Sequence, residues 1–330
     1  MGTTNDPRGR LTELYAATQA ALATAVASPD VDFVRRHYYE MQPSPASEPQ
    51  DDEIMGGGFD NAIDARPAAP DLERASARIV WPLDLVQIGF VLAEILGDPV
   101  TTGSSAPYTH TFSSGTAVLP IRTVERKFAS GAFDGVVGLV GRSIQFPIGA
   151  DRGYTRVSAD YTARQILDQY SSSVAGTPEA VALSARVPRK VGTIKRDGSA
   201  LGSIISGDAT ITNVLGEDNY HGSGLIDDVQ LEGRTLALNL VGRFKGAALR
   251  DLGKVQVGAY LPGVQDIELA WELSASLKLV LTIRNVRFAK TAPGTAGPGR
   301  MDVPLRGRAE VGASAAMVTA VLTNSRDGYA

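Results

Sequence analysis

Cysteine is absent from this sequence, and histidine and aromatic residues are scarce. Without cysteine there is no disulfide bond, no thiol nucleophile and no cysteine-ligated zinc site. The three histidines, His37, His110 and His221, are far apart and lack a ligand spacing such as His-Glu-x-x-His, so they predict no metal site. Aromatic residues make up only 6% of the chain and are scattered, which disfavours a sugar-binding face built on exposed rings.

Long apolar runs and a clustered excess of positive charge are missing as well. No run approaches the roughly 20 apolar residues of a membrane helix, and the first ten residues lack the apolar core of a signal peptide. We therefore expect a protein that is made in the cytoplasm and has no membrane partner. The formal net charge of −4 argues against a protein that grips nucleic acid, because phosphate binding needs clustered lysine and arginine.

The composition that is present indicates a globular, mainly β protein. The chain has 330 residues, of which 43% are apolar and 21% charged, and this is enough for two domains that each bury a core. The 35 glycines and 18 prolines follow no repeat, which is typical of turns between many short strands.

The two halves of the chain contain similar series of segments. In the first half a strand at residues 77–81 precedes an amphipathic helix, and a strand-like stretch follows at 141–146. In the second half a strand at 235–240 precedes a helical turn, and a similar stretch follows at 283–288. Recurrence at this long period predicts two copies of one supersecondary unit.

Local signals predict several individual elements. Pro7 suits the first position of a helix, and an apolar stripe extends this helix over residues 7–27. The stretch 42–70 is rich in proline and contains three consecutive glycines, so it predicts a long loop. Asp197-Gly198 lies between alternating segments and predicts a tight hairpin. A change of apolar phase near Arg284-Asn285 predicts a bulge in a bent strand.

Several motifs have residues that could carry chemistry, but each has a simpler interpretation. Asp51-Asp52-Glu53 lacks the ligand spacing of an EF-hand, Gly56-Gly57-Gly58 lacks the Lys-Ser/Thr ending of a phosphate loop, and Gly222-Ser223-Gly224 lacks the frame of a nucleophile elbow. We interpret all three as loops and predict no catalytic, cofactor or metal residues. The basic residues Arg186, Arg189, Lys190, Lys195 and Arg196 could contact DNA or an acidic patch, but a solvated hairpin face is favoured in an acidic chain.

Two segments are candidates for contacts with other molecules. The polar stretch 213–228 is longer than a tight turn and has the character of a functional loop; its candidate contact residues are Asn213, Glu217, Asp218, Tyr220, His221 and Asp227. Pro304 lies inside a strand-like segment, and proline favours an edge strand, where its missing N–H is not needed. We therefore expect an edge strand that another subunit could pair with, at Met301, Val303, Pro304 and Leu305.

A series of short motifs, taken in order, points to one known family. The first half contributes residues 86–97, then Thr101-Thr102-Gly103 and Pro107-Tyr108-Thr109-His110-Thr111-Phe112. The second half contributes residues 220–225, 233–252, 297–304 and 318–324. In this order the segments resemble the tail tube (major tail) proteins of long-tailed bacteriophages, the siphoviruses, in the long form with a duplicated tube domain. The resemblance covers about residues 70 to 325.

The resemblance implies a fold and an assembly. The fold would consist of two tandem tail-tube-type β-sandwich or barrel domains, each with a flanking short helix. Such subunits form rings that stack into the conduit for DNA ejection, and three chains with two domains each favour a trimeric, pseudo-sixfold ring over a hexamer. The implied partners are other copies of the chain, the tape-measure protein, tail terminator and tip proteins, and genomic DNA that passes without specific binding. The protein would be a virion component made in the host cytoplasm, with no cofactor.

Together these expectations divide the chain into four parts. Residues 1–30 would be an N-terminal helical arm, 31–170 the first tube domain, 171–207 a linker with a hairpin, and 208–330 the second tube domain. The polar loop 213–228 would bridge rings or subunits. The alternatives are a carbohydrate- or receptor-binding β-sandwich on a virion, and a hydrolase, which is disfavoured because no nucleophile–base–acid set stands out.

Overall fold

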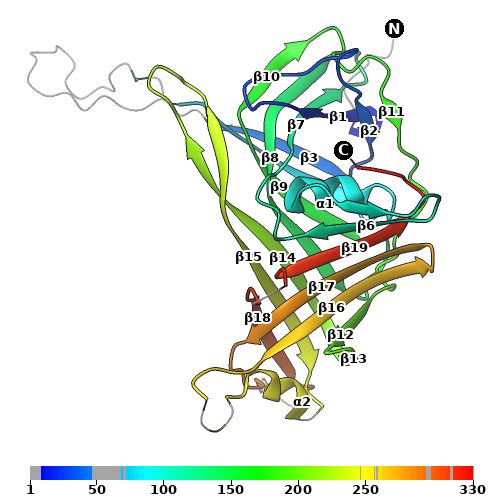
Figure 1. Cartoon of the computed structure of the whole chain (residues 1–330), viewed down its shortest axis with the longest axis vertical. Coiled ribbons are helices and arrows are strands. Elements are labelled where there is room, and N and C mark those ends of the chain that lie inside the picture. The colour runs from blue at the N-terminus through cyan, green and yellow to red at the C-terminus, as the bar shows by residue number, and fades with distance from the viewer. Residues whose placement is uncertain are drawn as a thin grey trace, which may run out of the picture.

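The computed structural model describes residues 9–46, 68–69, 72–245, 247–255, 257, 259–294, 299–312 and 315–329. Within these residues the chain forms nineteen strands and four short helical segments (Figure 1). The prediction of a mainly β fold is confirmed.

Eight antiparallel strands from both halves lie side by side in one continuous sheet. The strands of the first half are, in spatial order, β3 (Glu40–Ala46), β4 (Arg74–Pro82), β9 (Arg156–Ala163) and β8 (Phe133–Gly149). Those of the second half are β14 (Ile204–Asp218), β15 (Asp228–Arg243), β18 (Asp302–Ala309) and β17 (Leu277–Phe288). The end of β8 pairs with β14, and this pairing joins the two series.

The remaining strands extend two other regions of sheet. Around the first part of β8 lie β7 (Ile121–Lys127), β1 (Glu13–Gln19), β2 (Val34–Arg36), β11 (Glu179–Ala180) and β10 (Gln165–Tyr170). Around the first part of β17 lie β16 (Val264–Ser274), β12 (Thr193–Arg196), β13 (Ser199–Ala200), β19 (Val318–Asn324), β6 (Tyr108–Ser113) and β5 (Val100–Thr102). Phe146 and Trp271 pack together with ring centroids 5.5 Å apart, so β8 and β16 face each other across the core.

Two long strands change partners along their length, and each does so at a bulge. The first part of β8 pairs with β7 and β10, whereas its second part pairs with β9 and β14; Gly138, with φ +69°, lies at the change. The first part of β17 pairs with β16 and β19. Beyond Asn285, which has φ +50°, β18 replaces β19, while Val286 and Arg287 still pair with β16. The predicted bulge near Arg284-Asn285 is confirmed.

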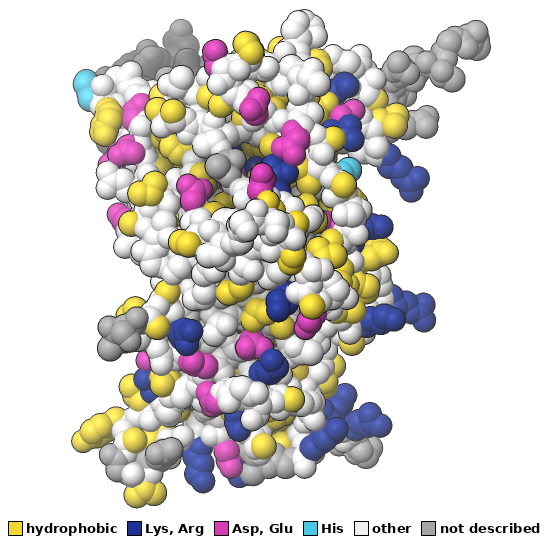
Figure 2. Space-filling model, turned by 45° about the vertical axis from the view of Figure 1, so that its right-hand side comes forward, with side chains coloured by type: hydrophobic (Ala, Val, Ile, Leu, Met, Phe, Trp, Pro, Cys, Tyr) yellow, Lys and Arg dark blue, Asp and Glu magenta, His cyan; other side chains and the backbone are white. Residues whose placement is uncertain are grey.

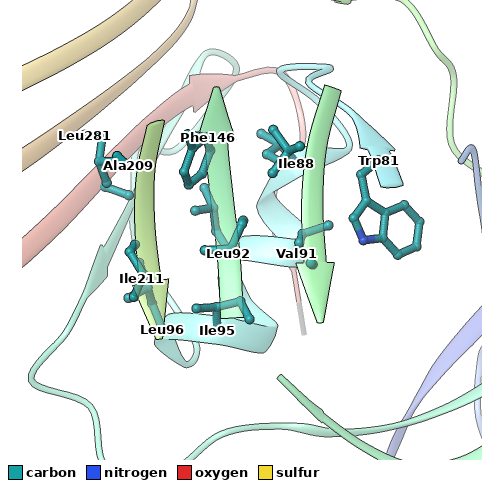
Figure 3. Packing of buried hydrophobic residues seen from close by; sticks show 14 of the residues in the cluster. Trp81, Ile88, Val91, Leu92, Ile95, Leu96, Phe146, Ala209, Ile211 and Leu281 are labelled. Atoms are coloured by element: carbon teal, nitrogen blue, oxygen red, sulfur yellow. The ribbon is translucent and has the colours of Figure 1, made fainter. Parts of the chain in front are cut away.

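The helix α1 (Ile88–Leu96) lies inside the core, and all nine of its residues are buried. The side chain of Asp84 accepts hydrogen bonds from the N–H groups of Val86 (2.9 Å) and Gln87 (3.2 Å), and Gly97 ends the helix with φ +89°. Figure 3 shows apolar side chains of α1 directed at the strands that carry Phe146, Ala209 and Ile211. The helix therefore packs onto strands of both halves.

The predicted N-terminal helix over residues 7–27 is wrong, because residues 13–19 form the strand β1. This strand pairs with β2 on one side and with β7 on the other. Both of its faces are buried: Leu14 and Ala16 belong to the main core, and Tyr15 and Ala17 pack in a smaller cluster. A strand buried on both faces has no polar alternation, so its apolar residues also fit a helical stripe.

Two predicted loops are shorter than expected. The loop 42–70 begins inside β3, which runs to Ala46; most of the rest, including Asp51-Asp52-Glu53 and Gly56-Gly57-Gly58, lies outside the described residues. The loop 213–228 is mostly a long hairpin of β14 and β15, and only residues 219–227 connect the two strands. The predicted Asp197-Gly198 turn is confirmed; both residues have positive φ, +47° and +78°, between β12 and β13.

Candidate functional site

The solvent-facing side of the eight-stranded sheet is polar across both halves. Its strand registers place hydroxyl, amide and charged side chains on one face, including Arg78, Ser158, Asp160, Ser143, Gln145, Asp208, Thr210, Asn239, Arg306 and Arg308. Their neighbours in the sequence point the other way into the core. Such a face suits contact with water or a hydrated polymer better than tight docking of an apolar surface.

Hydrogen bonds between strands hold part of this polar face in place. The Ser143 hydroxyl donates to Asp160 at 2.9 Å, and the Asn239 amide donates to Asp208 at 3.3 Å. Positive and negative side chains are mixed on this face: Arg78 lies opposite Asp160, and Asn239 lies between Asp208 and Arg306. An anion that passes over the face would therefore meet attraction and repulsion in turn.

The tip of the β14–β15 hairpin is held by Asp227. Its carboxylate accepts hydrogen bonds from the Tyr220 N–H (2.9 Å) and the Ser223 hydroxyl (3.0 Å), and it lies 3.5 Å from Arg164 on the neighbouring end of β9. The Tyr220 hydrogen bond above all, together with those from Ser223 and Arg164, lowers the pKa of Asp227 below its usual value. The tip is therefore an ordered structure.

The candidate loop residues divide into two groups. Asp218, Tyr220 and His221 are exposed near the tip, as a contact with another molecule requires. Glu217 is half-buried and accepts a hydrogen bond from Thr162 at 3.2 Å.

Asn213 is buried in β14, far along the hairpin from the tip. Its amide donates to the backbone carbonyls of Ile95 (3.0 Å) and Gly141 (2.8 Å), and its oxygen accepts from Arg234 at 2.6 Å. Arg234 also donates to the Ile95 carbonyl, and burial lowers the pKa of Arg234 to about 10. Both residues satisfy the carbonyl of Ile95 in the last turn of α1 and fix the hairpin to the helix.

The candidate edge residues lie on or next to β18, which pairs with β15 on one side. Val303 and Leu305 point into the core, Pro304 is exposed, and the Met301 carbonyl accepts from the Phe244 N–H at 2.9 Å. On its other side β18 pairs with residues 286–288 of β17, and residues 289–291 continue along it, so β18 is not at the sheet edge that the sequence predicts. The Ala289 N–H donates to the Arg306 carbonyl at 2.8 Å, and the Thr291 hydroxyl donates to the Pro304 carbonyl at 2.8 Å.

The structure shows an exposed apolar loop at one end of the molecule that the sequence does not predict. Between α2 (Ala247–Arg250) and β16, Val257, Tyr260 and Leu261 are 108%, 100% and 59% exposed. Figure 1 places this loop at the lower end of the molecule, and Figure 2 shows hydrophobic side chains gathered at that end. Isolated exposed apolar residues are common, but three in one loop mark a candidate contact surface.

A buried ion cluster anchors α1 to the N-terminal strands. Glu94 forms ion pairs with Arg36 from β2 and, at 3.5 Å, with Arg122 from β7; all three side chains are at least 96% buried. The Tyr161 hydroxyl donates to Glu94 at 2.8 Å. Burial lowers the pKa of Arg122 to about 10, and burial next to Glu94 raises that of Tyr161.

The basic cluster found in the sequence is largely paired within the chain. Arg189 lies 2.6 Å from Asp151, Lys195 lies 2.7 Å from Glu268, and Arg186 stacks over Tyr154 with its guanidinium carbon 4.0 Å from the ring centroid. These pairings reduce the charge available for phosphate.

Within the described part of the chain, no group of three or more metal-ligating side chains could hold a metal ion. His37 and His110 each contact a backbone carbonyl, of Val181 and Arg326 respectively, whereas His221 is exposed at the hairpin tip. None of the helices among the described residues has the length and apolarity that crossing a membrane requires.

Comparison with known proteins identifies one family. The family model described as "Phage tail tube protein" matches residues 9–315, which is most of the chain. The search of curated proteins gives no significant match. The matched region contains the whole eight-stranded sheet, α1, the hairpin tip and the apolar loop.

Proposed function

Because the chain belongs to the phage tail tube protein family and is a structural component of the phage tail, we propose that it assembles into stacked rings that form the conduit for DNA ejection. The polar face of the eight-stranded sheet would line the lumen. The observation that carries this proposal is one continuous sheet whose outward face holds small polar and mixed-charge side chains along its whole width.

The order of strands supports two tandem tube domains. In the first half a hairpin, β3–β4, leads to α1, and the spatial order is first hairpin strand, second hairpin strand, β9, β8. In the second half the hairpin β14–β15 leads to α2, and the order is first strand, second strand, β18, β17. With two such units per chain, we favour a trimeric ring of pseudo-sixfold symmetry over a hexamer.

The mixed charge of the polar face suits a DNA conduit. Affinity for a polyanion increases with each phosphate that a protein neutralises, so a lumen of uniform positive charge would retain DNA. The face has no uniform positive charge, because both signs occur on it, at Arg78, Asp160, Asp208 and Arg306. The chain as a whole carries a net charge of −4. DNA would pass without specific binding.

Contacts between rings would come from two opposite ends of the molecule. The hairpin tip with Tyr220 and His221 lies at the upper left in Figure 1, and the apolar loop with Tyr260 and Leu261 lies at the lower end. Tape-measure, terminator and tip proteins would contact the tube at its lumen and its ends.

Negative-stain microscopy of the purified chain tests the proposal. We expect stacked rings or tubes of uniform width at high protein concentration. Particles that stay monomeric at all concentrations, with shifts on adding sugars, would contradict a tube protein and favour a receptor-binding role. Replacing the exposed residues Asp218, Tyr220 and His221 by serine should weaken stacking more than it weakens folding.

A further inference from the structure

We propose that residues 289–293, which follow β17, form the strand against which β3 of a neighbouring copy pairs. The register would be the one that β8 and β14 adopt within a single chain. This inference rests on the proposed function, because it names the junction between subunits in the ring.

The pairing of β8 with β14 supplies the template. The end of β8 lies between β9 and β14, with Gln145 opposite Ser158 on one side and opposite Thr210 on the other. It joins the β3–β4–β9–β8 series to the β14–β15–β18–β17 series. If the two series repeat one unit, the same junction must recur between the end of the second series and the beginning of the first in the next chain.

The strand registers fix which positions correspond. Ser44 pairs with Ser76, which pairs with Thr162; Thr210 pairs with Ala237, which pairs with Arg308. When Pro147 is matched with Pro293, Gln145 corresponds to Thr291 and these two rows coincide, so Ser44 in β3 occupies the position of Thr210 in β14. By the same count Pro43 corresponds to Ala209, and Pro45 corresponds to Ile211.

Residues 289–293 correspond to the end of β8. The Ala289 N–H donates to the Arg306 carbonyl, and the Thr291 hydroxyl donates to the Pro304 carbonyl, so this segment runs along β18 as the end of β8 runs along β9. On β8, Ser143 and Gln145 occupy the corresponding places opposite Asp160 and Ser158.

The match of two prolines sets this alignment. Counting two residues beyond Gln145 reaches Pro147, and two beyond Thr291 reaches Pro293. Residues 289–293 form no strand in the single chain, although the end of β8, which has β14 as its partner, does. A neighbour's β3 would supply the missing partner.

The open edge of β3 is shaped for this partner. Among the described strands β3 pairs only with β4, in a ladder that continues to Ala46 opposite Arg74. Pro43 and Pro45 have no N–H, so the ladder must use residues 40, 42, 44 and 46, and both prolines face the open edge. That edge therefore offers carbonyls with few donors.

The two edges are complementary in hydrogen bonding. Since Ala289 faces β18, Lys290 and Ala292 face away from it and present N–H groups to the neighbour. In the proposed register these N–H groups donate to the carbonyls of Pro45 and Pro43. Two β3 edges cannot pair well with each other because both lack donors at the prolines, so the prolines favour the correct junction over a mistaken one.

Cysteine cross-linking tests the junction, and the absence of native cysteine makes the result clean. The double variant Ser44→Cys/Thr291→Cys should form disulfides between chains in assembled tubes. After oxidation, a denaturing gel should show a series of cross-linked species. The largest should contain all the chains of one ring, which is three for a trimer. The matched control Thr210→Cys/Gln145→Cys should cross-link within one chain, because these residues are direct partners. The variant Ser44→Cys/Lys290→Cys should give no cross-linked species, because the two side chains lie on opposite faces of the sheet.

A measurement on the unmodified chain keeps the test independent of the variants. Hydrogen exchange at Lys290 and Ala292 should slow at least tenfold when free chains assemble into tubes. Tubes that form without the 44–291 cross-link, or without this protection, would overturn the junction and leave the tube function standing. Failure of the unmodified chain to form tubes would overturn the proposed function itself.

Discussion

The helices of the two halves differ in how they are covered. In the first half every residue of α1 is buried, Glu94 is held by an ion cluster, and Tyr329 packs on Phe90 with ring centroids 5.0 Å apart. In the second half α2 and the short helix that follows it, Asp251–Gly253, bury Leu249 and Leu252 but expose Arg250. The chain covers the first helix with its own N-terminal strands and C-terminal tail, and it leaves the second open. We therefore expect the first half to contribute more stability, whereas the second half leaves more of its helix exposed.

Breaking one ion pair in each half should show the largest difference. Glu94→Ala leaves Arg36 and Arg122 as uncompensated buried charges, and we expect it to cost about 3–5 kcal/mol of unfolding free energy. Glu310→Ala removes the partner of Arg287 at a more exposed site and should cost about 0–1 kcal/mol. Denaturant unfolding measures both, and equal costs would contradict the comparison.

Truncating a leucine in each helix should show a smaller difference. Leu92→Ala in α1 removes a fully buried side chain, and we expect a cost of about 2–5 kcal/mol. Leu249→Ala in α2 should cost less, because Leu249 is 7% exposed on a short helix where neighbours and water can fill the space. A larger loss for Leu249→Ala in thermal or denaturant unfolding would show that the second half carries more stability than we infer.

Alkaline pH should destabilise the chain through the first half. Tyr161 is buried next to Glu94, and its pKa is raised above the ordinary value, which is near 10. A raised pKa contributes stability that is present below about pH 10 and is lost as pH rises toward the folded-state pKa. Unfolding free energy should therefore fall above pH 10, with a shallower slope in Tyr161→Phe. An unchanged slope in this variant would assign the alkaline loss to other groups.

The smallest effect on folding is expected at the apolar loop. Tyr260→Ser should change the unfolding free energy by less than about 0.5 kcal/mol, because its side chain is fully exposed. It should nevertheless raise the protein concentration that assembly requires. Val118→Ser, at an exposed first-half residue, is the matched control and should leave assembly unchanged. Sedimentation velocity across a concentration series distinguishes the two variants, and equal assembly would remove the loop from the contact surface.

The elements that could be predicted from the sequence are those with local signals. Asp84 and Gly97 mark the two ends of α1, Asp197-Gly198 makes the hairpin turn, and the apolar phase change near Asn285 marks the bulge. Each of these depends on a few neighbouring residues, so the sequence carries the information directly.

The elements that could not be predicted depend on distant contacts. Strand β1 pairs with β7, with Glu13 opposite Lys127, and only that pairing shows that residues 13–19 are extended. Asn213 is polar and lies in what resembles a loop, but its partners are the carbonyls of Ile95 and Gly141. The candidate surface was anticipated in part, at Tyr220 and His221, whereas the exposed loop at Tyr260 gave no periodic signal.

In the proposed tube, the mixture of charges on the sheet face bears on how fast a genome could leave. Strands in a sheet lie roughly 5 Å apart, which is within a Debye length at physiological ionic strength, so a moving phosphate samples several opposite charges at once and their pull largely cancels. If this face lines the lumen as proposed, it would exert little drag on a sliding double helix. Transit should then depend on internal pressure and hydration, with little sensitivity to added salt.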